Sequence, residues 1–177
     1  MPVHIKQFDR DKALEAILFI AQGFDNSIFH SISKMLYISD KLHLQEYGRL
    51  ICGDRYRYIA MESDPVPSAI YNMMKVAAKK QSNNVEWNEI IQDALNVRHS
   101  REGLPKRDCD MDMLAESEIE CIQKTIAEYG SKSFVQLKVL TRDSAWQAIN
   151  DNQHIPLESI VATLPNAAEV AGYLHSH

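Results

Sequence analysis

Residues 13–21 constrain the fold most strongly, because eight of these nine residues are hydrophobic and only Glu15 is charged. Asp9 suits an N-cap and Gly23 suits a helix end, so the pattern predicts a helix over about 9–22. Such a helix has almost no polar face, and we expect it to be buried on most sides at the centre of a bundle. The stretch is shorter than the ~20 hydrophobic residues that a membrane-spanning helix needs.

The rest of the chain also indicates regular, mostly helical structure. Its 177 residues include only 6 Gly and 6 Pro, with no internal repeat and no Gly/Ser-rich linker. We therefore predict a mainly α, single-domain helical bundle over residues 1–177, with one small β-hairpin. Its core is expected at about residues 9–165, followed by a short C-terminal helix or tail.

A second helix is predicted from Asn26 or Ser27 to Gly48. On a helical wheel, one side carries Ile28, Ile32, Met35, Leu36, Ser39, Leu42 and His43, and the opposite side carries Lys34, Tyr37 and Lys41. This two-sided pattern predicts a helix that packs one face into the core.

The remaining elements are shorter. Residues 50–61 are aromatic and partly alternating, which predicts a small β-hairpin or extended arm that ends at residues 64–68. Ser117 and Glu120 have the spacing of a capping box and predict a helix that ends at Gly130. Further helices are expected at 68–80, 87–95, 134–140, 144–150, 157–164 and 166–174, with an irregular region at 96–112.

Several classes of protein are disfavoured. The cysteines Cys52, Cys109 and Cys121 have unrelated spacings, which indicates reduced thiols and neither a disulfide framework nor a zinc site. No nucleotide-binding or metalloprotease motif is present, so we expect no cofactor and no metal. The net charge of −5 argues against nucleic acid as a partner. The lack of a signal-peptide pattern predicts a cytoplasmic protein without a membrane partner.

Asp40 and His43 are the residues that catalysis would use first. At i and i+3 they are neighbours on the second helix, and a carboxylate can orient a histidine. His43, however, lies on the hydrophobic side of that helix. A structural role is therefore favoured, with His43 hydrogen-bonded to Asp40 or to a backbone carbonyl of the hairpin.

Residues 47–58 contain a basic-aromatic cluster. In one interpretation the tyrosines pack the hairpin onto the bundle, and the arginines pair with Asp40, Asp54 or Glu62. In the other, an exposed arm contacts a partner protein. The cluster comprises Arg49, Arg55 and Arg57 with Tyr47, Tyr56 and Tyr58, and the candidate partner-binding residues are Arg55, Tyr56, Arg57 and Arg49.

The block Lys34-Met-Leu-Tyr-Ile-Ser-Asp-Lys-Leu-His-Leu-Gln-Glu-Tyr-Gly-Arg49, continued by Gly53-Asp54, Ala60-Met61 and Pro65-Val-Pro-Ser68, resembles the Panacea (SocA-like antitoxin) domain. A second stretch, with acidic residues at 108–117, Leu140-Thr141 and Ala145-Trp146, is also similar to this family. The motif positions, expected to be structural, are Lys34, Tyr37, Asp40, His43, Tyr47, Gly48, Gly53, Asp54, Pro65 and Pro67.

Three features depart from the family pattern. Asp64 stands where the family has Gly before Pro-Val-Pro, so Asp is expected to make a turn that elsewhere uses positive φ. The stretch from Gly53 to Met61 is about two residues longer than usual, at Arg55-Tyr56 or Arg57-Tyr58. A His of the family is absent beside residues 141–143.

The resemblance implies an antitoxin that neutralises a cognate toxin protein by direct binding, through occlusion or through delivery to a protease as adaptor. One alternative is a prophage-encoded binding protein in phage defence or counter-defence. Another is an enzyme that uses Asp40 and His43, which would need a pocket open to solvent at His43. The resemblance itself implies no enzymatic activity, and the oligomeric state is left open.

Overall fold

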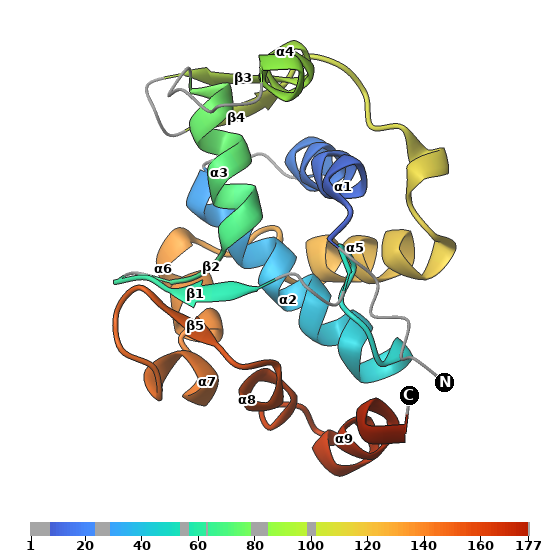
Figure 1. The fold of residues 1–177 in the computed structure, drawn as a ribbon, viewed down its shortest axis with the longest axis vertical. Coiled ribbons are helices and arrows are strands. Elements are labelled where there is room, and N and C mark those ends of the chain that lie inside the picture. Colours follow the sequence, from blue (N-terminus) through green and yellow to red (C-terminus); the bar gives the residue numbers. More distant parts are fainter. Residues whose placement is uncertain are drawn as a thin grey trace.

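A computed structural model describes residues 8–23, 29–53, 57–62, 64–78, 85–98 and 102–176. The fold is mainly α, as predicted, with a small antiparallel sheet at one side (Figure 1). The helices are α1 (Arg10–Gly23), α2 (Phe29–Tyr47), α3 (Ser68–Ala77), α4 (Val85–Ala94), η1 (Met111–Met113), α5 (Glu116–Tyr129), α6 (Phe134–Thr141), α7 (Ser144–Gln147), α8 (Leu157–Val161) and α9 (Ala167–Ser176). The strands are β1 (Tyr58–Ala60), β2 (Pro65–Pro67), β3 (Leu95–Arg98), β4 (Glu102–Pro105) and β5 (Gln153–Ile155).

The first helix, α1, is buried as predicted, with eight of its 14 residues buried. Asp9 caps it, since its Oδ1 accepts the backbone N–H of Lys12 at 3.0 Å. The helix packs against α2, α3 and α5. Its buried carboxylate, Glu15, accepts two hydrogen bonds from the guanidinium of Arg107, at 2.6 and 3.0 Å, which fasten the segment before η1 to the core.

Helix α2 crosses the middle of the molecule and contacts α1, α5, α6, α8, α9 and β2 (Figure 1). The prediction that only one of its faces packs into the core is wrong. Lys34 and Tyr37, on the opposite face, are 0% and 1% exposed. The reason is tertiary: β2 and α6 cover the face that a helical wheel marks as polar. The start predicted near residue 26 lies outside the described residues.

The hairpin predicted within residues 50–61 exists, but its second strand comes from residues 65–67. Strand β1 pairs with β2, in the register Tyr58 with Pro67, and on its other side with β5, in the register Tyr58 with Ile155. Residues 65–67 were expected only to end the hairpin, and proline lacks the backbone N–H of a sheet ladder. In the sheet order β2-β1-β5 they form an edge strand, where proline is tolerated.

Two more expectations need correction. The region 96–112, expected to be irregular, contains most of an antiparallel hairpin of β3 and β4, in which Asn96 pairs with Leu104. Helix α5 exists, but Ser117 and Glu120 are not its capping box. The helix begins one residue before Ser117, and the carboxylate of Glu118 accepts the backbone N–H of Ala115 at 2.8 Å.

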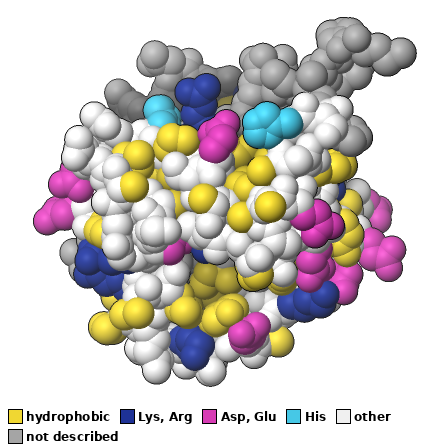
Figure 2. All heavy atoms as spheres, turned by 90° about the horizontal axis from the view of Figure 1, so that it is seen from below, with side chains coloured by type: hydrophobic (Ala, Val, Ile, Leu, Met, Phe, Trp, Pro, Cys, Tyr) yellow, Lys and Arg dark blue, Asp and Glu magenta, His cyan; other side chains and the backbone are white. Residues whose placement is uncertain are grey.

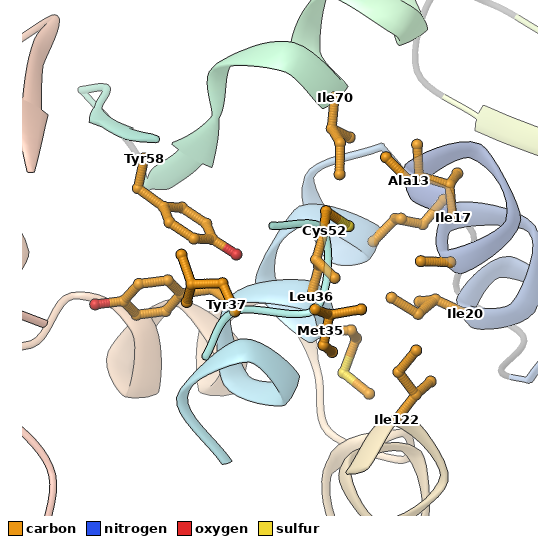
Figure 3. Close-up of a cluster of buried hydrophobic side chains, with 14 of the residues drawn as sticks. Ala13, Ile17, Ile20, Met35, Leu36, Tyr37, Cys52, Tyr58, Ile70 and Ile122 are labelled. Carbon is orange, nitrogen blue, oxygen red and sulfur yellow. The ribbon is translucent and has the colours of Figure 1, made fainter. Parts of the chain in front are cut away.

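The buried side chains form one hydrophobic cluster that extends along the chain from Ala13 to Val170. Figure 3 shows its centre, where Ile17 and Ile20 of α1 point toward Met35 and Leu36 of α2. Farther along α2, the rings of Tyr37 and Tyr58 meet edge to face with centroids 4.9 Å apart. The two hydroxyls point in different directions in the figure, and each has its own carboxylate partner, described below.

In the described ranges, none of the helices is both long enough and hydrophobic enough to cross a bilayer. Over the same ranges, no group of three or more His, Cys, Asp or Glu side chains is arranged to hold a metal ion. The three cysteines are present as free thiols.

Candidate partner-binding site

Asp40 fixes both ends of the segment that leads from α2 to β1. Its side chain is 1% exposed, and its two oxygens accept hydrogen bonds from the backbone N–H of Ile51 at 2.8 Å and from the hydroxyl of Tyr58 at 2.6 Å. Burial raises the pKa of Asp40 to about 7, although both hydrogen bonds act in the opposite direction. The carboxylate therefore anchors the basic-aromatic segment from inside the molecule.

His43 is fully buried and has a partner for each ring nitrogen. Nδ1 lies 2.8 Å from the carbonyl oxygen of Arg49, and Nε2 lies 3.0 Å from Oγ of Ser117. Because a carbonyl only accepts, Nδ1–H donates to it, and Nε2 of the neutral ring accepts from the Ser117 hydroxyl. Burial lowers the pKa of His43, in keeping with a neutral ring. His43 thus joins α2 to α5, and no hydrogen bond connects it to Asp40.

Glu118 of α5 is a charged centre that sequence reasoning missed. Its buried carboxylate accepts hydrogen bonds from Lys12 at 3.0 Å, from Arg49 at 2.7 Å and from the backbone of Ala115. Burial opposes the charge, but these hydrogen bonds outweigh burial and hold the pKa of Glu118 below its ordinary value. The sequence did contain a signal for this contact, because Glu118 follows Ala115 by the three residues of a capping box. Ser117 and Glu120 have the same spacing, and Ser is the better capping residue, so that pair was predicted instead.

Arg49 is consequently tied to the interior on one side. Its expected partners were Asp40, Asp54 or Glu62, and its carboxylate partner is Glu118 instead. The Arg49 side chain is 26% exposed, so part of it reaches the surface beside α5.

A second buried ion pair joins α2 to β2. The ammonium of Lys34 contacts Oδ2 of Asp64, and both side chains are almost fully buried. Burial lowers the pKa of Lys34, while Asp64 favours its charged form. Lys34 also lies 4.3 Å from the ring centroid of Phe134, over its face. Asp64 lies in the turn as expected, since its backbone exchanges hydrogen bonds with Met61 at 3.0 and 3.1 Å. It does so without positive φ, because Asn152 is the sole non-glycine residue with positive φ in the described part of the chain.

A third contact connects α2 to the segment before α7. Oδ2 of Asp143 accepts hydrogen bonds from the hydroxyl of Tyr37 at 3.0 Å and from the ammonium of Lys41 at 2.8 Å. The other oxygen of Asp143 caps α7 through the backbone N–H groups of Ala145 and Trp146. Burial, together with the charge of Asp143, raises the pKa of Tyr37. Asp143 was not predicted as a partner.

The remaining motif positions define turns and the sheet edge. Gly48 and Gly53 have φ of 69° and 104°, a region that favours glycine. Pro65 and Pro67 are buried in β2. Tyr47 is 42% exposed, and its ring lies 4.8 Å from that of His43. Asp54 lies outside the described residues.

The basic-aromatic arm is only partly described. Arg55 and Tyr56 lie outside the described residues, whereas Arg57 is exposed at the start of β1 and Tyr58 is buried. Arg57 borders a pocket of about 310 Å³, which we call the arm pocket. Its wall comes from the start of β1, from β5 and from α8, and includes His154, Pro156 and Glu158. Arg57 and Arg49 therefore face different surroundings, namely the arm pocket and α5.

A known family model spans the part of the chain that holds these motif positions. No curated protein and no solved structure matches the chain. The family model of the antitoxin SocA-like, Panacea domain matches residues 32–147, which include most of α2, the β1–β2 hairpin, α5 and α6. These are the elements joined by the contacts of Lys34, Asp40 and His43. The match covers more than half of the sequence, and the chain belongs to the antitoxin SocA-like, Panacea domain family.

Proposed function

We propose that this protein is an antitoxin that neutralises a cognate toxin protein by binding it directly. The observation that carries the proposal is the family match over residues 32–147. The internal contacts of the motif support it, because Lys34, Tyr37, Asp40 and His43 are all buried. In this arrangement the motif builds the scaffold, and exposed residues outside it recognise the toxin.

The burial of the Asp40 and His43 side chains favours binding over catalysis. A general acid or base has to come within hydrogen-bond reach of its substrate. His43 is 0% exposed with both nitrogens engaged, and both oxygens of Asp40 accept protein hydrogen bonds. A substrate would have to displace these contacts before reaching either group.

The arm that includes Arg57 is our first choice for toxin contact. Arg57 is exposed beside the arm pocket, where an arginine can stack on a partner or pair with a carboxylate of it. Arg49 belongs to the same segment, but a substitution there would also break its contact with Glu118. Arg57 is therefore the cleaner position to test.

The test is co-expression with the adjacent open reading frame, scored for growth and for pull-down. The frame alone is expected to be toxic, and this protein is expected to restore growth and to co-purify with the product. Arg57→Glu should weaken rescue, whereas Lys75→Glu, at an exposed position on α3, is the matched charge reversal. Absence of both toxicity and complex would contradict the antitoxin proposal.

Occlusion and protease delivery differ in what happens to the toxin. In occlusion the amount of toxin stays constant while growth recovers. In delivery the toxin disappears faster when the antitoxin is present, and a protease-deficient host loses the rescue. Immunoblots of the toxin after a translation block distinguish the two mechanisms.

A further inference from the structure

Helix α6 exposes more hydrophobic surface than its position in a bundle requires. Val135 and Val139 are 66% and 72% exposed, and Leu140 is 41% exposed. Val135 and Val139 are one helical turn apart and form a ridge on the outer face, while Leu137 and Thr141 on the inner face are buried. No hydrophobic-core requirement explains this ridge, because the inner face already anchors the helix.

A groove lies beside the ridge. It runs between α2, α5, α6 and the α8–α9 connection, has a volume of about 260 Å³, and is lined on its hydrophobic sides by Ile38, Leu42, Tyr129, Leu140 and Leu164. Figure 2 views the molecule from the side of α8 and α9 and shows a hollow lined mainly by hydrophobic atoms. The volume lies below the roughly 300–1,000 Å³ of typical small-molecule sites, and suits side chains from a protein partner better.

The charge around the ridge differs from that of the whole chain. Residues 129–142 contain Lys132, Lys138 and Arg142 and no acidic residue, although the whole chain has a net charge of −5. The adjacent acids are Glu128, which lines the groove, and Asp143, whose charge is paired with Lys41. Lys138 and Arg142 also lower the pKa of the buried Lys34, after the larger effect of burial, so both positive charges are close enough to Lys34 to repel its ammonium. A hydrophobic ridge flanked by positive charge is complementary to a segment with hydrophobic and acidic residues.

We propose that the α6 ridge (Val135, Val139 and Leu140) and its groove dock an acidic amphipathic helix of the partner protein. The partner helix would place hydrophobic residues at i, i+4 and i+7 along the groove, and its acidic residues near Lys132 and Lys138. This inference rests on the proposed antitoxin function for the identity of the partner as a toxin. The chemistry of the surface itself is independent of that function.

The first experiment uses a fluorescein-labelled acidic amphipathic peptide of about 18 residues, or five helical turns, with Leu at the i, i+4 and i+7 positions and Glu between them. Binding to the full chain is measured by fluorescence anisotropy. Val139→Glu should weaken binding by roughly tenfold or more, as loss of an interface anchor does. Val85→Glu is the matched control, because Val85 is 70% exposed on α4, far from α6 (Figure 1).

Charge is tested by reversal. A peptide with Lys in place of each Glu should bind the wild-type chain much more weakly, and Lys138→Glu should reverse the preference of the two peptides. Circular dichroism of each variant checks that the fold is retained, as expected for substitutions at exposed positions. Absence of binding, an equal loss with Val85→Glu, or equal binding of both peptides would overturn the proposal.

The co-expression assay then separates this inference from the proposed function. Loss of rescue with Val139→Glu but not with Val85→Glu supports docking of the toxin on the ridge. If the wild type rescues and Val139→Glu rescues equally well, the docking inference is overturned while the antitoxin function stands. If the wild type does not rescue, the antitoxin proposal fails, and the peptide measurement alone decides the inference.

Discussion

Replacing Asp40 measures how strongly the motif holds the segment from α2 to β1. Asp40→Ala leaves the hydroxyl of Tyr58 and the backbone N–H of Ile51 without their acceptor inside the protein. Each buried donor that loses its partner costs about 1–3 kcal/mol, so the variant should lose roughly 2–6 kcal/mol of its free energy of unfolding. Asp40→Asn keeps an oxygen for Ile51 and an amide group for Tyr58, and should lose less.

The same carboxylate makes stability depend on pH with a definite sign. Burial raises the pKa of Asp40 from 3.8 to about 7, so the folded protein holds this proton more tightly than the unfolded chain. Its contribution to stability is fully present below the unfolded pKa and is lost as pH rises through about 7. Between pH 5 and pH 8, wild type should therefore lose about 3 kcal/mol relative to Asp40→Asn, which lacks this titration.

Urea unfolding followed by circular dichroism at pH 5, 6, 7 and 8 tests both expectations. Tyr58→Phe completes a double-mutant cycle. In the Asp40→Ala background it removes a hydroxyl that has lost its acceptor, so it should lower the free energy of unfolding less there than in wild type. The reasoning is refuted if the difference between wild type and Asp40→Asn is the same at every pH. It is also refuted if Asp40→Ala is as stable as Asp40→Asn.

Three further substitutions test other contacts. Glu118→Gln should cost roughly 2–4 kcal/mol at pH 7, because two basic groups lose their counterion. The depressed pKa of Glu118 makes that contribution vanish as pH falls through the folded pKa, so urea unfolding at pH 4 should show a smaller difference. Asp64→Asn should lower the free energy of unfolding by about 3–5 kcal/mol, because it leaves the buried ammonium of Lys34 unpaired. The double variant Asp64→Val with Lys34→Met removes both charges and should be destabilised less than this single variant in the same unfolding assay. Gly48→Ala should lower the free energy of unfolding by about 1–2 kcal/mol in calorimetry, since φ is 69° and the added Cβ would lie 2.6 Å from the ring of Tyr173. Adding Tyr173→Ala to this variant removes the clash but not the backbone strain, so it should restore only part of the lost stability.

The elements that the sequence predicted well depend on local information. The start of α1 at Arg10 follows from the capping side chain of Asp9, and its burial follows from the near absence of polar residues between 13 and 21. The family was also recognisable from contiguous residues, because Lys34 to Arg49 occupy one helix and the turn that follows it. Helix periodicity and capping act over a few residues, so a sequence displays them directly.

The candidate site depended on distant partners. The sequence placed Asp40 and His43 one helical turn apart, yet their hydrogen bonds go to Ile51, Tyr58, Arg49 and Ser117 and not to each other. Strand β5 was missed because three residues carry little periodicity, and its pairing with β1 spans nearly a hundred positions. The exposure of Arg57 also depended on how β5 and α8 pack around it.

The helical class, the buried first helix and the family follow from local patterns of hydrophobic, capping and motif residues, which the chain displays without a structure. Which polar residues are buried depends on tertiary packing. A helical wheel places Lys34 on the solvent-facing side of α2. It is buried because Asp64, directly before β2, lies against it and Phe134 of α6 covers it. The cost of burying a charge is offset by a partner far away in the chain, and such a partner is set by packing rather than by local sequence.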